Sequence, residues 1–230
     1  MGEALLWGLA AGAALVAGGL VALFTEMSPR LLGLLLGFGA GAFISAVAYE
    51  LIGGATSVAG RSGRVASGLA VGAVLSYAVA TRADRSADLG GGILPGIVIS
   101  VVPEAVIVVG ALLLGHGVDI AVIAAVALCG FPEAVAATER LQKQGMSPSR
   151  IVLLWVGMAL LVGISAAVGY TLLEGVSPGA VAFVLALGGG VVLTQLVAVM
   201  IPEASSLSGR AVGLAATAGF ALSVALVSLA

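Results

Sequence analysis

The chain has 230 residues, of which 61% are hydrophobic and only 9% are charged. Because soluble domains carry roughly 25% charged residues, this composition excludes a water-soluble fold and makes a lipid bilayer the expected solvent. The formal net charge of −2 offers no basic surface for nucleic acid. A single cysteine, Cys129, excludes an internal disulfide and a cysteine-based zinc cluster.

Eight charge-poor segments approach the roughly 20 residues that a helix needs to cross a membrane. They cover residues 4–24, 31–53, 65–81, 92–114, 118–138, 151–173, 179–201 and 211–230. Turn formers or charges separate them, and the fourth break is a short turn, Gly115-His116-Gly117. The sequence therefore predicts an all-α, polytopic membrane helix bundle of eight transmembrane helices, forming a single transmembrane domain over residues 1–230.

Glycine is unusually frequent, at 35 residues. Small residues let membrane helices approach closely, since packing rather than hydrophobicity joins helices in lipid. The composition therefore predicts a closely packed bundle.

The basic residues are distributed unevenly over the predicted loops. Seven of the nine lie in the first, third, fifth and seventh loops: Arg30, Arg82, Arg85, Arg140, Lys143, Arg150 and Arg210. The other two, Arg61 and Arg64, lie in the second loop. Cytoplasmic loops carry an excess of Lys and Arg. We therefore expect a multi-pass protein of the cell membrane with both termini extracytoplasmic.

Two internal similarities relate helices that run in opposite directions. Residues 100–106, Ser-Val-Val-Pro-Glu-Ala-Val, match residues 129–135, Cys-Gly-Phe-Pro-Glu-Ala-Val. Residues 39–45 resemble residues 188–194 more weakly, and a chance likeness between glycine-rich helices is an equally weighted alternative for this pair. Opposed repeats of this kind predict an inverted repeat, an architecture in which transporters build a site near the bilayer midplane.

Glu104 and Glu133 fall near the centre of the predicted fourth and fifth helices. A charge at that depth costs several kcal/mol, so it is usually functional and usually partnered. No Lys, Arg or His lies at comparable depth, so a cation or protons must compensate these carboxylates. The structural alternative is a pair of protonated glutamates that hydrogen-bond to hold helices together.

A proline directly precedes each glutamate. Pro103 and Pro132 have no N–H, so the carbonyls of Ile99 and Leu128 lose their helical partners. Free carbonyls at mid-membrane are tolerated where they line a cavity and can bind cations. The alternative is an ordinary proline kink.

A small polar residue lies one helical turn before each glutamate. Ser100 is four residues before Glu104, and Cys129 is four residues before Glu133, which puts each pair on one helix face. A thiolate suits zinc and other late metals, whereas carboxylates and hydroxyls suit harder ions. The pattern predicts a metal site formed by Glu104, Glu133, Ser100 and Cys129. A lone buried cysteine is, however, more often a small hydrophobic residue than a ligand.

The paired Pro-Glu motifs resemble those of the ZIP (Zrt-, Irt-like) family of divalent-metal transporters. Residues 100–105, Ser-Val-Val-Pro-Glu-Ala, align with the family pattern His-Asn-x-Pro-Glu-Gly, and residues 129–134 align with its fifth-helix counterpart. Residues 201–203, Ile-Pro-Glu, resemble the end of the family's seventh helix. The resemblance covers nearly the whole chain. It implies eight helices in a 3+2+3 inverted repeat, no permanent cofactor, and zinc, manganese, iron or cadmium as the transported ion.

The chain also departs from the family pattern. Ser100 stands at the histidine position, Val101 at the asparagine position, and Gly130 at a position that is polar in some members. The predicted sixth helix has no carboxylate, where many members place one, and residues 82–92 contain no histidine. These differences imply at most one metal site and a changed metal preference.

Other polar residues are weaker candidates. Glu50 and Glu203 could guide cations, but solvated charges at helix ends are the favoured interpretation. Ser45, Thr194 and Gln195 could add ligands, although Ser and Thr more often bond to backbone carbonyls. His116 is expected in an ordinary outer turn.

We expect the chain to transport divalent metal cations through a midplane site between the fourth and fifth transmembrane helices. The alternative is a transport-inactive ZIP-like membrane protein that binds or senses a cation. An enzyme is not expected, because no Ser–His or Cys–His pair lies at depth. The expected partners are the cation and the bilayer, and the sequence leaves open a homodimer, the ion, the direction and any proton coupling.

Overall fold

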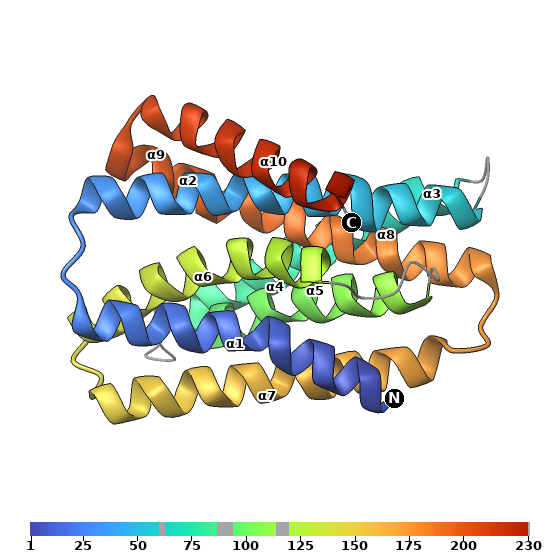
Figure 1. Ribbon diagram of the computed structural model, residues 1–230, viewed down its shortest axis with the longest axis horizontal. Coiled ribbons are helices and arrows are strands. Elements are labelled where there is room, and N and C mark those ends of the chain that lie inside the picture. Colours follow the sequence, from blue (N-terminus) through green and yellow to red (C-terminus); the bar gives the residue numbers. More distant parts are fainter. Residues whose placement is uncertain (60–62, 87–93, 114–119, 230) are drawn as a thin grey trace.

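A computed structural model describes the chain apart from residues 60–62, 87–93, 114–119 and 230. Side chains at 83–86, 94–103, 120–122, 125, 227 and 229 are also outside the description. The described residues form helices and short connections, with no strand among them. The predicted all-α architecture is confirmed for this part of the chain (Figure 1).

Each predicted segment is helical over its described residues. The elements are α1 (Gly2–Phe24), α2 (Pro29–Ala46), η1 (Val47–Gly53), α3 (Gly54–Ala59), α4 (Arg64–Ser86), α5 (Leu94–Leu113), α6 (Ile120–Lys143), α7 (Pro148–Leu173), α8 (Pro178–Gln195), η3 (Leu196–Met200), α9 (Ile201–Ser208) and α10 (Ala211–Leu229). The segments η1 and η3 are π-helical and join their neighbours without a break, so α2–η1–α3 and α8–η3–α9 are two long continuous helices.

Five helices in the described part of the chain are long and apolar enough to cross a membrane. They are Gly2–Phe24, Pro29–Ala59, Arg64–Arg82, Pro148–Leu173 and Pro178–Ser208. Shorter apolar helices cover Glu104–Leu113 and Ala211–Leu226. These lengths and compositions agree with a helical membrane bundle.

Two predicted helix ends were wrong. The second and seventh helices, expected over 31–53 and 179–201, continue to Ala59 and Ser208 and are 31 residues long each. The Gly53-Gly54 pair and Pro202 lie within these helices. A glycine can remain helical, and Pro202 lies in the first turn of α9, directly after the wide π turn, where a missing N–H is tolerated.

The predicted loop from Glu139 to Arg150 was also too long. The helix α6 runs to Lys143, and α7 begins at Pro148 with Ser147 at the N-cap position. Proline is favoured in the first helical turn because its missing N–H would be unpaired there anyway. Only a short turn remains, with Gly145 at a φ of 81°.

Glycines bring pairs of helices into backbone contact, as the composition predicted. A Cβ at Gly41 of α2 would clash with the carbonyl oxygen of Ala216 in α10. A Cβ at Gly72 of α4 would clash with the carbonyl of Leu187 in α8. Larger side chains at these positions would force the helices apart.

Matching features recur in the first and last parts of the chain. The π segments begin at Val47 and Leu196, which are 149 residues apart. Each follows a helix that begins with a proline after a serine at the N-cap position. Gly219 of α10 packs on the carbonyl of Phe38 in the same way as Gly72 of α4 packs on the carbonyl of Leu187.

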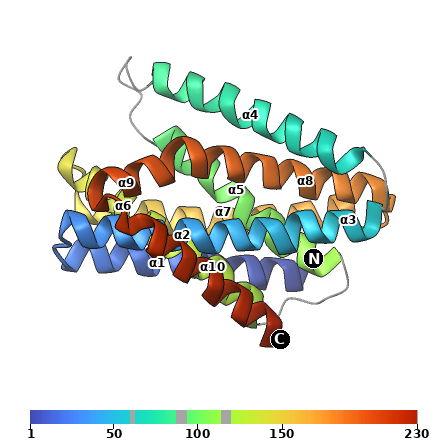
Figure 2. The ribbon, with the colours of Figure 1, turned by 90° about the horizontal axis from the view of Figure 1, so that it is seen from above.

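The contacts divide the helices into two groups. One group contains α1, α5, α6 and α7, and the other contains the two long helices with α4 and α10 (Figures 1 and 2). The most extensive contact between the groups is that of α2 with α6. Both termini lie toward one end of the bundle, opposite the end at which α6 stops and α7 begins (Figure 1).

Candidate functional site

Glu104 lies inside the bundle, against the backbone of α6. Its side chain is 1% exposed, although it carries a carboxyl group. A Cβ placed on Gly130 would lie 2.5 Å from Glu104 Oε1 and 3.1 Å from Leu15 Cδ2. Glycine at position 130 therefore provides the space that the Glu104 carboxyl group occupies.

The second carboxyl oxygen of Glu104 has no partner among the described residues. Its Oε2 atom is buried and makes no hydrogen bond there. No Lys, Arg or His is buried in the part of the chain that the structure describes. Because an uncompensated buried carboxylate is very unfavourable, the site requires either a proton or a cation.

Cys129 and Glu133 lie on one face of α6, a helical turn apart. Cys129 is fully buried and Glu133 is partly buried. The structure places Glu104 of α5 against the backbone of α6, the helix that carries Cys129 and Glu133.

Pro132 fixes this part of α6 against the other helix group. A Cβ on Gly39 of α2 would lie 3.1 Å from Pro132 Cγ. Pro132 is buried within the continuous helix α6. The proline ring therefore packs against α2, where the two helix groups meet.

Ser100, the fourth predicted ligand, lies on α5 one turn before Glu104. Its side chain and that of Pro103 are outside the described set. Among the residues that are described, no group of three or more His, Cys, Asp or Glu side chains could hold a metal ion. The three described candidates, two carboxyl groups and a thiol, do not form such a group.

The weaker candidates differ in their surroundings. Thr194 donates its hydroxyl to the Gly190 carbonyl at 2.9 Å, which is the backbone bond expected of it. Ser45 is buried in α2, and its Oγ makes no hydrogen bond to the described residues. Gln195 is partly buried at the end of α8, and Glu50 is partly buried within η1. The residues His116 and its two flanking glycines lie outside the described ranges.

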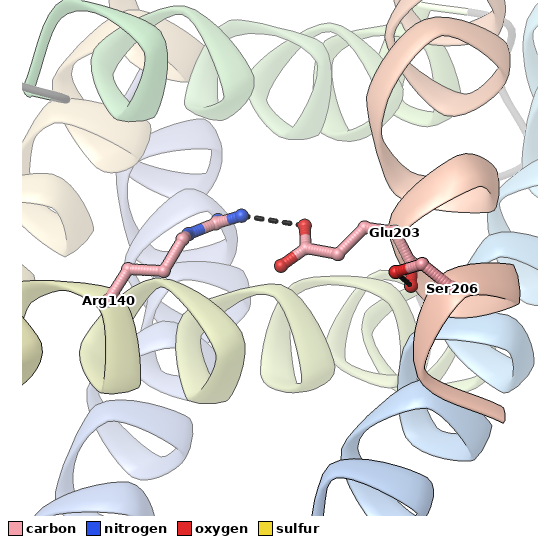
Figure 3. A network of polar contacts seen from close by, with 3 residues as sticks. All are labelled: Arg140, Glu203 and Ser206. Carbon is pink, nitrogen blue, oxygen red and sulfur yellow. Dashed lines mark hydrogen bonds and ion pairs between the residues drawn. The ribbon is translucent and has the colours of Figure 1, made fainter.

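Glu203 was expected to be a solvated charge at a helix end, and this was wrong. It lies within the long seventh helix, in α9, and its carboxylate accepts a 2.6 Å ion-pair hydrogen bond from Arg140 Nη1 (Figure 3). Ser206 donates to the backbone carbonyl of Glu203 at 2.7 Å, which is a bond within α9. Sequence reasoning placed Arg140 in a loop, because the end of α6 was predicted too early.

The spacing of charges on α6 contained a signal for this pair. Arg140 follows Glu133 by seven residues, or two helical turns, which keeps both on one face if the helix continues. An arginine on that face needs an acidic partner when it is only partly exposed. The sequence did not indicate which acidic residue from another helix would meet it.

No protein-family model matches this sequence, and a comparison with curated proteins finds no match. The likeness to ZIP transporters stays an expectation from the sequence motifs.

Proposed function

We propose that the chain transports divalent metal cations across the cell membrane through a site between α5 and α6. The ion is bound by the carboxylates of Glu104 and Glu133, with Ser100 and Cys129 as additional ligands. Zinc, manganese, ferrous iron and cadmium are the candidate substrates. The ion is cargo, and no permanent cofactor is required.

The observation that carries this proposal is the state of Glu104. A carboxyl group at 1% exposure, with one oxygen that has no partner among the described residues and a second acidic side chain on the neighbouring helix α6, is an unfavourable arrangement without a counter-charge. No buried basic side chain among the described residues supplies that charge. A divalent cation would neutralise both carboxylates at once.

We further propose that the chain is a 3+2+3 inverted repeat of eight transmembrane helices. In this arrangement α1, α2–η1–α3 and α4 correspond to α7, α8–η3–α9 and α10. The paired π segments support it, as do the matched glycine contacts with Phe38 and Leu187. Within α5 and α6, the two Pro-Glu-Ala-Val sequences provide the central pair.

The proposed orientation places both termini outside the cell. Its support is the excess of Lys and Arg in the odd-numbered connections, which include Arg30, Arg150 and Arg210. The end of the bundle at which α6 stops and α7 begins is then cytoplasmic.

Transport requires the site to open to each side in turn. The group containing α5 and α6 carries the ion, and the group containing the two long helices forms the surface against which it moves. Where the groups meet, Gly39 of α2 packs on Pro132 of α6.

Metal uptake by purified protein in liposomes, measured ion by ion, tests the proposal. Glu104→Gln and Glu133→Gln should lose uptake, and Glu3→Gln, at the exposed start of α1, is the matched control. A parent protein that takes up no divalent ion would refute the transport function.

A second candidate is a transport-inactive protein that binds or senses a cation. It is favoured by the lack of three clustered ligands among the described residues. This protein would bind metal in a titration with the same dependence on Glu104 but would show no uptake into liposomes.

A further inference from the structure

One face of α6 carries the site and continues to an ion pair. Cys129, Glu133 and Arg140 are spaced by four and seven residues, so all three lie on the same face. Arg140 is about 10 Å beyond Glu133 along the helix axis, at a rise of about 1.5 Å per residue. A cation leaving Glu133 along this face toward the end of α6 would meet the Arg140 guanidinium.

The partner of Arg140 belongs to the other helix group. Glu203 comes from α9, and the Nη1–Oε2 distance is 2.6 Å (Figure 3). The two side chains are 40% and 25% exposed, so the pair lies near the surface rather than in the core. A second ion pair among the described residues, between Lys143 and Glu139, joins residues within α6 and cannot connect the groups.

We propose that the Arg140–Glu203 ion pair is a latch that closes the α6 end of the cation path. While the pair is formed, α6 is held to α9, and the Arg140 guanidinium lies on the path that a cation would take from Glu133. Opening requires α6 to separate from α9, which removes Arg140 from its partner. That a cation follows this path rests on the proposed function. The closure of the α6 end does not depend on transport.

The native cysteine reports on this closure without any added metal. Cys129 is the only cysteine in the chain, is 0% exposed, and lies eleven residues, or about three helical turns, before Arg140. We would label it with a membrane-impermeant thiol reagent in sealed membrane vesicles of both orientations. The rate from each side is measured for the parent, Arg140→Gln, Glu203→Gln and the exchanged pair Arg140→Glu with Glu203→Arg.

Each single variant should be labelled about fivefold faster than the parent, because a partly exposed pair contributes modestly to the closed state. The increase should occur only from the side of the Arg140 end, and the exchanged pair should return the rate toward that of the parent. Lys143→Gln, which removes a basic residue from the same turn of α6, should leave the rate unchanged. Thermal unfolding of each variant separates a local opening from a general loss of structure.

Three results would overturn the latch. They are parental rates in both single variants, equal increases from both sides, or an exchanged pair that is labelled as fast as the single variants. The outcome is independent of the uptake assay. A latch in a protein that transports nothing would refute the proposed function alone, and transport without a latch would refute this inference alone.

Discussion

Oε1 of Glu104 and the backbone of Gly130 are in direct contact, although they belong to different helices. A Cβ at position 130 would stand 2.5 Å from that oxygen. The carboxyl group is therefore held against α6, on the helix that also carries Cys129 and Glu133. Because Gly130 has no side chain, the Glu104 carboxyl group can lie against α6.

Gly130→Ala should displace the Glu104 carboxyl group. We expect a loss of about 1–3 kcal/mol in unfolding free energy, typical of overpacking, together with weaker metal binding. Thermal unfolding and metal titration measure the two effects. Gly157→Ala is the control, because a Cβ there would meet nothing within 4 Å. If Gly130→Ala matches this control in both measurements, the carboxyl group is not confined by α6.

Glu104→Gln should abolish cation binding while keeping the fold. The substitution removes the charge but nearly keeps the shape, and a buried neutral amide costs less than an uncompensated carboxylate. The affinity for the cation should fall by more than about 100-fold. Substitution of residues that only support a metal ligand costs up to about 100-fold, and loss of a ligand itself should cost more. The unfolding temperature should be at or above that of the parent. Parental binding by this variant would make Glu104 a structural residue.

Glu133→Gln should have the same effect on binding, measured by the same titration. Glu133 is partly exposed, so the change should alter stability less than Glu104→Gln does. If Glu133→Gln binds the cation with the affinity of the parent, Glu104 is the only one of the two carboxylates that binding requires.

Cys129→Ser tests the contribution of sulfur. If the thiolate is a ligand, affinity for cadmium should fall far more than affinity for manganese, because soft metals prefer sulfur. Cadmium binding to the parent should also strengthen as the pH rises, since the thiol must lose its proton to bind. Unchanged affinity for both metals would show that Cys129 only fills space in the core.

The two termini should both be extracytoplasmic. Tags at either end should be cleaved by protease added to intact cells, and a tag in the connection between α6 and α7 should be protected. The basic residues near that connection give the expectation its physical basis. A protected N-terminal tag would reverse the proposed orientation of the bundle.

The sequence by itself determined the class of protein and the segments that form helices. A chain with 9% charged residues cannot cover a soluble surface, and every long apolar segment must satisfy its backbone within a helix once water is absent. The site candidates on α6 followed from helical spacing, because Cys129 and Glu133 are one turn apart on any regular helix. Local rules of this kind need no knowledge of the neighbouring helices.

Only the tertiary structure decided which residues meet across helices. Gly130 was noted as a departure from a motif, and its contact with Glu104 depends on the distance between α5 and α6. Arg140 and Glu203 are 63 residues apart and pair because two helix ends converge. Helix spacing and rotation arise from packing summed over many small side chains. They cannot be read from the order of residues along one helix.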